Sequence, residues 1–373
     1  MGLPLVTPIF RLVLRVLTFV LYAVTIMSAY GGRIDPDLLT LPAVVGLLLP
    51  YLSIATAIAS VAWICARRFV TGGFGVLTLV VCSQPVLTAC PISFAKNPTP
   101  GADTFTVMTY NVLHGRDQEA HGEQAGNRAI EYVINSGADI VCLQELLWYH
   151  PDDVPNFTPS LRDSLFTAYP YHEYVPHLDT KVLSKYPFKI IPGEKLIRKE
   201  YDYGRYSFYE INVKGRKLTL VNMHLCSPRL SDEERNVVTE IKSVKGAKES
   251  MAEMRGSIGH KMRIAYQKRK HDTSILRDVL DRIEGPVIVC GDMNDVPESY
   301  AYRLLRGTDL KDAYTETGFG PMITYNQHLF WFHLDQILYR GPLKALSVKR
   351  GKLRASDHYP VTAEFEFTDR IAK

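Results

Sequence analysis

The segment Val287-Ile288-Val289-Cys290-Gly291-Asp292-Met293-Asn294 decides how the second part of this chain folds. It begins as a short apolar run rich in β-branched residues, which predicts a buried strand. The run ends in a glycine followed by two polar side chains, Asp292 and Asn294. In open α/β sheets, groups that bind and react lie just beyond the carboxyl ends of such strands. The segment therefore predicts an α/β domain with a polar site at a strand end.

The same pattern recurs along the chain in both directions. Strand-like apolar runs are expected at Thr104–Tyr110, Asp139–Gln144, Lys217–Met223, Pro286–Cys290, Leu334–Tyr339 and Thr362–Phe367. Apolar residues at i, i+3 and i+4 predict helices over Ala125–Ser136 and Ser274–Ile283. Because strands alternate with helices, we expect a layered α/β domain that spans residues 103–373.

Polar residues stand at the end of one predicted strand after another. They are Asn111, Glu145, His224, Asp292 with Asn294, Asp335, and the adjacent pair Asp357 and His358. Each of them alone is most simply a surface residue. Together they form a set of carboxylates, amides and imidazoles, the groups that acid–base and metal-assisted phosphoryl chemistry uses. We therefore treat them as one candidate site.

Residues 1–95 differ from the rest of the chain because they carry almost no charge. Three apolar stretches, at about 12–30, 38–65 and 69–94, are long enough to cross a bilayer as helices. None of the three contains Asp, Glu, Lys or His, although transporters and proton relays normally need such a residue. We interpret residues 1–95 as a membrane anchor with three transmembrane helices.

The arginines suggest an orientation for this anchor. Arg11 and Arg15 flank the first stretch, and Arg67 and Arg68 lie between the second and the third. By the positive-inside rule these ends are cytoplasmic, so three crossings place the rest of the chain on the outer side of the membrane. The first stretch also resembles a signal peptide. Its removal would change the number of helices but not the side that the domain reaches.

Two further segments complete the organisation. Residues 96–102 form a short Pro-rich linker. Residues 229–272 form an insertion with helical apolar spacing and no strand pattern. Between Lys242 and Lys270 this insertion has nine Lys and Arg against two Glu. Such a basic segment either lies on an anionic membrane or contacts a polyanion, or it packs as a helical arm on its own domain.

The strand-end residues belong to longer motifs. These are Met108-Thr109-Tyr110-Asn111-Val112, Leu143-Gln144-Glu145, Met223-His224-Leu225, Gly291-Asp292-Met293-Asn294 and Ser356-Asp357-His358-Tyr359-Pro360. Residues 103–369, which contain all of them, resemble the endonuclease/exonuclease/phosphatase superfamily of DNase I-like proteins. The resemblance implies a four-layer sandwich of two mixed β-sheets flanked by helices, with a metal-dependent phosphoric ester hydrolase activity.

The resemblance also implies a role for each residue. Glu145 is the expected metal ligand, with Asn111 and Asp357 nearby, and the expected ion is Mg²⁺, with Mn2+ as a substitute. Asp292 orients or deprotonates the attacking water, and Asn294 donates to the reacting phosphorus group. His224 and His358 bracket the phosphate, and Asp335 orients His358. Which group acts as the base cannot be read from the sequence, because such clusters titrate together.

Five residues outside these motifs are harder to assign. Arg205 is either a phosphate contact or a surface arginine. Asp179 and Lys181 stand where relatives usually carry glycine and small residues, which indicates either a change in specificity or drift in a loop. We assign no role in the site to His114, nor to His333.

Two functions follow from this sequence. The first is a membrane-integral phosphoesterase that acts on lipid head groups at the outer face of the membrane, where the anchor concentrates the enzyme beside its substrate. The second is an extracytoplasmic nuclease that cuts DNA or RNA. No aromatic stacking platform for nucleic acid is recognisable in the sequence. No feature indicates an obligate protein partner.

Overall fold

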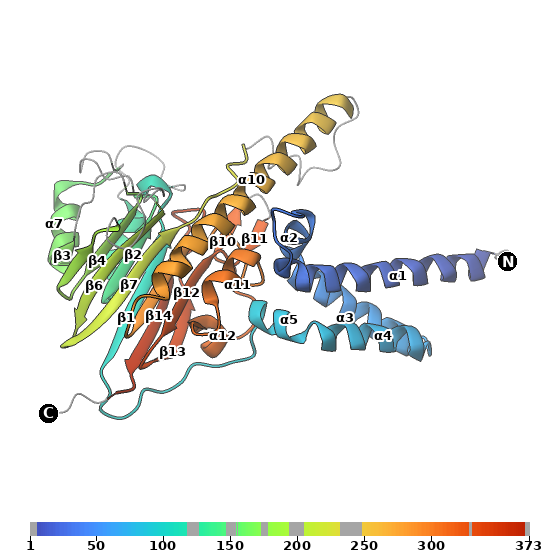
Figure 1. Cartoon of the computed structure of the whole chain (residues 1–373), viewed down its shortest axis with the longest axis horizontal. Coiled ribbons are helices and arrows are strands. Elements are labelled where there is room, and N and C mark those ends of the chain that lie inside the picture. The colour runs from blue at the N-terminus through green and yellow to red at the C-terminus, as the bar shows by residue number, and fades with distance from the viewer. Residues whose placement is uncertain are drawn as a thin grey trace.

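The structure is a computed structural model of the 373-residue chain. It describes residues 6–117, 127–146, 154, 156–172, 178–193, 205–231, 248–327 and 330–369. A C-terminal domain built on two β-sheets stands beside an N-terminal bundle of apolar helices (Figure 1).

The first sheet has six strands. In spatial order they are β13 (Leu343–Arg350), β14 (Val361–Phe367), β1 (Thr104–Asn111), β2 (Ile140–Gln144), β4 (Thr180–Ser184) and β3 (Tyr171–His172). Strands β1 and β2 are parallel, and the other neighbours are antiparallel. The sheet is therefore mixed, and β1 and β2 end at the same edge.

The second sheet also has six strands. In spatial order they are β5 (Phe188–Ile191), β6 (Tyr206–Val213), β7 (Arg216–His224), β8 (Val287–Asp292), β12 (Asp335–Arg340) and β9 (Lys311–Asp312). Only β7 and β8 are parallel. All six strands predicted from the sequence are present, with ends that differ by no more than two residues.

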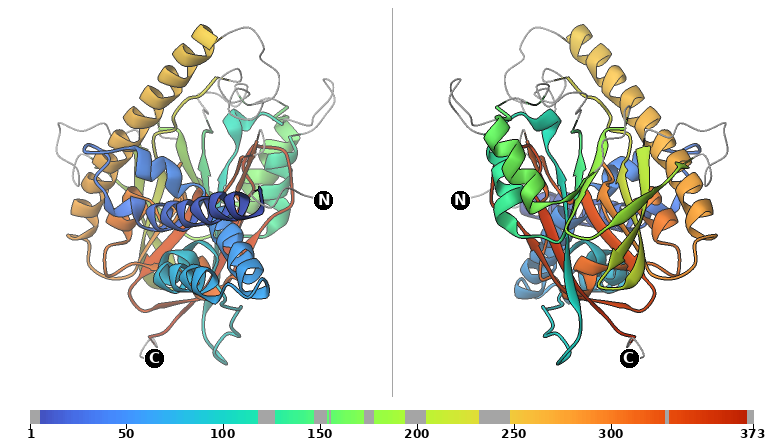
Figure 2. Two further views of the ribbon diagram at one scale, coloured as in Figure 1. Left: turned by 90° about the vertical axis from the view of Figure 1, so that its right-hand side faces the viewer. Right: turned by 90° about the vertical axis from the view of Figure 1, so that its left-hand side faces the viewer.

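The two sheets pack face to face, with helices on their outer faces (Figure 2). Every second residue of a strand points to the same face of its sheet. On the facing sides, Val107 and Cys142 of the first sheet pack with Leu220 and Ile288 of the second, which forms the core between the sheets. The intervening residues of the first sheet pack under α6 (Arg128–Ser136) and α7 (Pro159–Ala168). Those of the second sheet pack under α10 (Lys248–Leu280) and α11 (Tyr300–Arg306). This is the expected four-layer sandwich.

Smaller elements complete the domain. The helix α12 (Ala313–Thr317) contacts β13, and the short strands β10 (Tyr325–Gln327) and β11 (Phe330–Phe332) pair as a separate hairpin. A single turn of 3-10 helix, η2 (Leu113–Gly115), follows β1.

The N-terminal helices differ from the three continuous spans expected from hydropathy. The helix α1 (Val6–Tyr30) and the turn η1 (Gly31–Arg33) contain the only single stretch, Pro8–Arg33, that is long and apolar enough to cross a membrane among the described residues. The second expected span, 38–65, is divided into α2 (Leu41–Gly46) and α3 (Leu49–Cys65).

The third expected span, 69–94, is divided as well. It consists of α4 (Phe69–Val81) and α5 (Ser83–Ala89), which meet at an angle of 62°. Pro85 explains the bend, because proline has no N–H to donate to the carbonyl of Val81 four residues earlier. The Tyr30 hydroxyl donates to this carbonyl instead, at 2.6 Å. If the bent pair counts as one span, two helices of the described chain satisfy the criteria for crossing a membrane.

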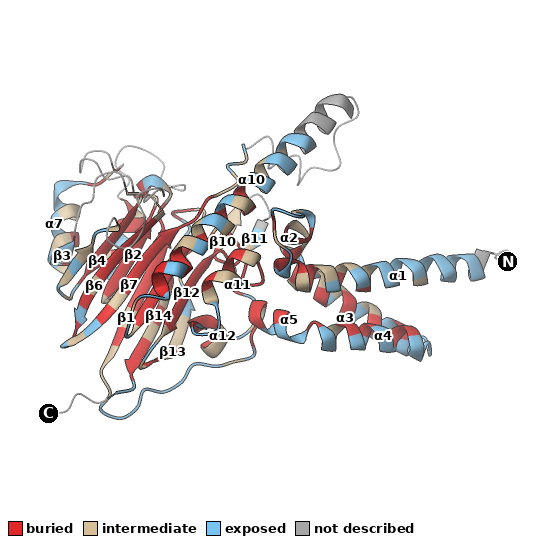
Figure 3. Ribbon diagram, viewed as in Figure 1, coloured by how far each residue is buried: buried red, intermediate tan, exposed pale blue. Residues whose placement is uncertain are grey.

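Figure 3 shows that the bundle helices are exposed on their outer side and buried where they meet. The buried residues include many small polar ones, and the exposed residues include many large apolar ones. Thr25 of α1 bonds Thr56 of α3 at 2.8 Å, and the Ser60 hydroxyl donates to the Gly72 carbonyl of α4 at 2.6 Å. Leu17 and Ile58, on the outer surface of the same helices, are 60% and 65% exposed. This distribution is the reverse of that in a water-soluble bundle and is typical of helices that pack in lipid.

The expected linker and insertion are both in contact with the C-terminal domain. In the linker, Thr99 donates to the Glu366 carboxylate through its backbone N–H at 2.6 Å and its hydroxyl at 2.9 Å. In the insertion, residues 232–247 lie outside the described ones, and the chain from Lys248 onward forms α10. The predicted helix Ser274–Ile283 is the end of this longer helix. The predicted helix Ala125–Ser136 begins at Arg128, capped by the Asn127 side chain, and its first residues lie outside the described ones.

Candidate active site

The strand-end residues meet at one edge of the sandwich, between the two sheets. Asn111 is the last residue of β1, and Glu145 directly follows β2. His224 ends β7, and Asp292 ends β8 beside it in the parallel register. Asp335 begins β12 and pairs with Asp292 across the antiparallel ladder. The topology thus brings together side chains that lie far apart in the sequence.

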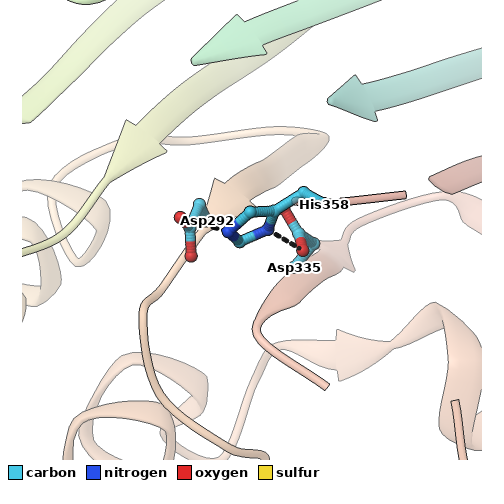
Figure 4. Close-up of side chains that lie close together, drawn as sticks. All are labelled: Asp292, Asp335 and His358. Carbon is cyan, nitrogen blue, oxygen red and sulfur yellow. Dashed lines mark hydrogen bonds and ion pairs between the residues drawn. The ribbon is translucent and has the colours of Figure 1, made fainter. Parts of the chain in front are cut away.

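His358 lies between two buried carboxylates (Figure 4). Its Nδ1 is 2.8 Å from Asp335 Oδ2, and its Nε2 is 3.6 Å from Asp292 Oδ2. All three residues are almost completely buried. Their ligand atoms lie within 4.8 Å of one another, which also fits a metal site. Because both imidazole nitrogens face carboxylates, we interpret the trio as an acid–base chain in which Asp335 orients His358.

A second histidine is held in the same way. His224 Nδ1 is 2.6 Å from Asp179 Oδ2. Its Nε2 is buried, has no hydrogen-bond partner, and lies 3.6 Å from Glu145 Oε1 and 3.7 Å from Asp292 Oδ2. With Nδ1–H donated to Asp179, a protonated Nε2 presents an N–H to any oxygen that enters between these carboxylates.

The charges at this edge shift the acid–base properties of the cluster. Burial lowers the pKa of His358, but the charges of Asp335 and Asp292 and the hydrogen bond that His358 donates to Asp335 outweigh it, so the pKa lies well above the ordinary value. Burial also lowers the pKa of His224, but Asp179, Asp292 and Glu145 together outweigh this effect. The pKa of His224 therefore lies above the ordinary value. Burial raises the pKa of Asp292 to about 6, against the opposing charge of His358. Both imidazoles are thus stabilised as cations beside a carboxylate.

Glu145 occupies the entrance of the site. Its side chain is 20% exposed, and its Oε1 accepts a hydrogen bond from Asn111 Nδ2 at 3.0 Å. Asn111 Nδ2 also donates to Asp292 Oδ2 at 3.1 Å. The backbone of Glu145 has a φ of 58°, a left-handed conformation that is uncommon for a residue with a side chain. This backbone turns the carboxylate from the end of β2 towards Asn111.

Asn294 holds Asp292 in place. Its amide donates to Asp292 Oδ2 at 3.1 Å and to the Leu225 carbonyl at 3.0 Å. Its own backbone N–H donates to Asp292 Oδ1 at 2.7 Å. The preceding Gly291 is required here, since a Cβ on it would lie 1.9 Å from the Met223 carbonyl oxygen of β7. The predicted donation from Asn294 to the reacting phosphorus group stays a prediction.

The donors at the entrance suit a hard divalent cation. Glu145 and the half-buried Asp357 supply carboxylates, and Mg²⁺ or a similar ion binds through one or two such groups and keeps several waters. The Ser356 hydroxyl donates to the Asn111 carbonyl at 2.8 Å, which holds the turn containing Asp357 against the end of β1. The Asn111 side-chain oxygen accepts from Leu113 N–H at 3.1 Å, and its amide N–H orients Glu145. The predicted contact of Asn111 with the metal stays a prediction.

The structure differs from the sequence predictions for three side chains around the site. Arg205 lies apart from the cluster, with its Nε 3.8 Å from Asp272 Oδ2 of α10, and its contact with phosphate stays a prediction. His114, which we had not assigned to the site, has its Nε2 3.4 Å from Glu145 Oε2. Asp179 is the partner of His224, and its departure from the family pattern was the available signal.

A buried amide pair beneath the site was also missed. Gln144 Nε2 donates to Asn222 Oδ1 at 2.7 Å and so joins β2 of the first sheet to β7 of the second. Asn222 in turn donates to the Leu143 and Lys181 carbonyls. This network fixes the two sheets relative to each other one residue below Glu145 and two below His224. Nothing in the spacing of these residues identifies it.

Several solved structures are similar to this chain. The chain is similar to D. rerio TDP2 complexed with single strand DNA product, at 16% identity, covering 70% of this chain and 99% of that one, with a TM-score of 0.46. It is similar to the human Nocturnin catalytic domain with bound sulfate anion, at 19% identity, covering 73% and 100%, with a TM-score of 0.44. It is also similar to an endonuclease/exonuclease/phosphatase from Beutenbergia cavernae, at 15% identity, covering 71% and 72%, with a TM-score of 0.44. No curated protein matches it in sequence.

The chain also matches a family in sequence. Residues 108–358, about two thirds of the chain and all of the motifs except part of the last, match the profile of the Endonuclease/Exonuclease/phosphatase family. The protein therefore belongs to the Endonuclease/Exonuclease/phosphatase family of metal-dependent phosphoric ester hydrolases.

Proposed function

We propose that the protein is a membrane-anchored, Mg²⁺-dependent phosphoesterase that hydrolyses phosphate esters in lipid head groups at the outer face of the membrane. Glu145 and Asp357, with Asn111 orienting Glu145, are the residues that would hold the ion. When bound, Mg²⁺ would stabilise the negative charge that develops on the phosphate oxygens.

The chain's own residues account for binding and proton transfer. His224 Nε2–H, which has no partner, donates to a phosphate oxygen from one side. His358, held by Asp335, donates from the other side or returns a proton to the leaving oxygen. Asp292, fixed by Asn294, orients the attacking water. Two held imidazoles and one held carboxylate thus suit in-line attack on a phosphate ester.

The N-terminal bundle supports the membrane part of the proposal. Its helices present apolar side chains outward and small polar ones inward, a distribution that water disfavours. The N-terminal end of α1, with Arg11 and Arg15, and the α3–α4 turn, with Arg67 and Arg68, both lie at the end of the bundle away from the sheets (Figure 1). Basic residues at that end favour a cytoplasmic location for it and an outer location for the C-terminal domain.

The β10–β11 hairpin is the observation that carries the lipid part. On one strand, the Tyr325 ring contacts the His358 ring at 5.1 Å, and Asn326 N–H donates to the Asp357 carbonyl. On the other strand, the Trp331 carbonyl accepts from the Tyr51 hydroxyl of anchor helix α3 at 3.2 Å. One hairpin thus spans from the catalytic histidine to the anchor, and the 46% exposed Trp331 is of a type enriched at bilayer interfaces.

A substrate panel tests this proposal. The full chain, purified in detergent with Mg²⁺, is offered phospholipid and sphingolipid in mixed micelles, inositol phosphates, and DNA and RNA oligonucleotides. We expect turnover of a lipid substrate that stops when a chelator removes the ion and returns when Mg²⁺ or Mn²⁺ is added. Turnover of oligonucleotides with none of any lipid would contradict the proposed substrate and favour a nuclease.

Variants of the site distinguish the activity of this protein from that of a contaminating enzyme. Glu145→Ala and Asp292→Ala should each lower turnover by orders of magnitude while the melting temperature stays near that of the unmodified chain. Lys217→Ala, at an exposed position on β7 far along the strand from His224, is the matched control and should leave turnover unchanged. Near-normal turnover in either site variant would overturn the assignment of the site.

A further inference from the structure

A polar cavity lies where the bundle meets the C-terminal domain. Its volume is about 250 Å³, and it lies among the end of α1, the helix α5 and the helix α11. The lining includes Arg33, Gln84 and Thr88 from the bundle and Glu298, Arg303 and Arg306 from the domain. None of these six residues belongs to the catalytic cluster.

The two walls of the cavity are in direct backbone contact. A Cβ on Gly32 would lie 1.9 Å from the Glu298 carbonyl oxygen, so η1 is pressed against the loop before α11. Only glycine permits this approach. The cavity is therefore part of a close interface between anchor and domain.

Three arginines give the cavity its charge. Within the described part of the chain, Arg33, Arg303 and Arg306 form no ion pair with a carboxylate, and the Nε of Arg306 is buried without a hydrogen-bond partner. Burial, followed by the charges of Arg33 and Arg306, lowers the pKa of Arg303. Cations at the C-terminal end of α11 are favoured by the helix dipole, but Arg33 comes from a different segment. Arg33 and Arg303 are exposed and Arg306 is half-buried, so an anion that enters the cavity from solvent can pair with all three guanidinium groups.

The single acid in the cavity does not neutralise them. Glu298 is 5% exposed, and its Oε2 has no hydrogen-bond partner. Burial raises the pKa of Glu298 to about 8, so at pH 7 the carboxyl is mostly protonated. A protonated carboxyl donates a hydrogen bond, and an oxyanion accepts it. Glu298 lines the same cavity as the three arginines, so this donor is available to a ligand bound there.

We propose that this cavity binds a phosphate group through Arg33, Arg303, Arg306 and Glu298. A tetrahedral phosphate has enough oxygens to accept from several guanidinium groups and one carboxyl, and arginine suits it through paired N–H donors. The volume also leaves room for the glycerol or other alcohol to which the phosphate is esterified. The cavity lies at the end of the apolar helices, where a bilayer would place its head groups. The ligand is thus the phosphate of an anionic lipid head group or a free phosphate, and binding does not depend on catalysis.

Binding to the full chain in detergent tests the site. Native mass spectrometry with added phosphatidic acid or phosphatidylcholine, and calorimetric titration with inorganic phosphate or glycerol phosphate, are carried out with chelator present. The unmodified chain should bind at least one phosphate-bearing ligand in a 1:1 complex. Arg33→Gln and the double variant Arg303→Gln, Arg306→Gln should weaken it about tenfold or more. Arg68→Gln, an exposed arginine at the other end of the bundle, is the matched control and should stay within about twofold.

The two possible sources of the phosphate group, a lipid head group and a soluble phosphate, give different results. Loss of phosphatidic acid binding in the cavity variants, with no binding of the soluble ligands, identifies a lipid head group. Loss of inorganic phosphate or glycerol phosphate binding in the same variants identifies a site that takes free phosphate. Equal binding by the cavity variants and Arg68→Gln, or no binding of any ligand by the unmodified chain, overturns the proposal. Equal melting temperatures of all variants exclude unfolding as the cause.

Discussion

Asp179 determines how His224 is presented to the substrate. The 2.6 Å contact between Asp179 Oδ2 and His224 Nδ1 fixes the ring, so that Nε2 points into the space between Glu145 and Asp292. A carboxylate in this position selects the tautomer and stabilises the imidazolium. The same arrangement joins Asp335 to His358 across the site, so the two histidines are held symmetrically.

Asp179→Asn should therefore lower kcat by about 10- to 100-fold, because an amide cannot stabilise the imidazolium while the ring stays in place. Asp179→Glu should recover part of the rate. Since Asp179 is partly exposed, the melting temperature should change little. Steady-state kinetics on the best substrate of the panel, recorded against pH, makes the comparison. Unchanged kcat in Asp179→Asn would show that His224 does not need this partner.

Glu298 gives the folded protein a defined dependence on pH. Its pKa is raised from 4.5 to about 8 by burial, so the folded chain keeps a proton that the unfolded chain loses near pH 4.5. This contribution to the free energy of unfolding is fully present below about pH 4.5 and is lost as the pH rises through about 8.

Glu298→Gln should remove this dependence, because the amide stays neutral at every pH. In phosphate-free buffer the variant should melt near the unmodified chain at pH 5 and above it at pH 8.5. Thermal unfolding of both proteins across this range provides the measurement. Parallel curves for the two proteins would mean that Glu298 ionises normally in the folded state.

At the scale of elements, α10 connects the anchor to the active-site loop. The Lys270 ammonium lies 2.6 Å from both Asp35 and Asp37, and the Tyr266 hydroxyl donates to the Ala43 carbonyl at 3.2 Å. On the same stretch of helix, the buried Arg269 donates to the Asn294 carbonyl at 2.8 Å and lies 3.1 Å from Asp295 Oδ2. Part of the basic insertion thus packs on its own domain through Arg269, while Lys270 pairs with the N-terminal segment.

Arg269→Met should be strongly destabilising, by about 3–5 kcal/mol, because it leaves the buried Asp295 carboxyl and the Asn294 carbonyl without their partner. It should also lower kcat, since the loop that carries Asn294 loses its main support. Lys268→Met, at the adjacent exposed position, is the matched control and should change neither quantity. Chemical unfolding and steady-state kinetics measure the two effects. A stable, fully active Arg269→Met protein would separate α10 from the site.

The sequence was most informative where structure depends on neighbours in the chain. Apolar runs located all six predicted strands, and the polar residues that end them meet as expected because β1 with β2 and β7 with β8 are parallel. Asp179 was not assigned because its role arises from a contact with His224 across 45 residues and between two sheets.

The helices were predicted less well for a related reason. Hydropathy measures how apolar a segment is but not the direction of its axis, so the 62° bend at Cys82 was missed even though Pro85 signalled it. Likewise, Gly256 and Gly259 weaken helix propensity, yet α10 continues through both. Packing of its C-terminal half on the second sheet stabilises the helix beyond its intrinsic propensity.

At the scale of the whole molecule, the anchor and the catalytic domain are one connected unit. The β10–β11 hairpin, the α10 contacts and the arginine-lined cavity all lie between them. If the proposed membrane location holds, a hydrolase held in this way works on a high local concentration of any substrate in its own bilayer. Under this proposal the location of the enzyme is a part of its substrate choice.

Reconstitution of the full chain into vesicles tests this central claim most directly. The vesicles contain the lipid substrate found in the panel, and the bulk solution contains an oligonucleotide and a second set of protein-free vesicles with the same lipid, distinguished by an isotope. Phosphate-ester hydrolysis is then followed in all three pools. We predict that lipid is hydrolysed in the protein's own bilayer and that little lipid is hydrolysed in the protein-free vesicles. With the Asp292→Ala protein, we predict no lipid hydrolysis in either set of vesicles. Cleavage of the oligonucleotide while the lipid of the same bilayer stays intact would contradict the account.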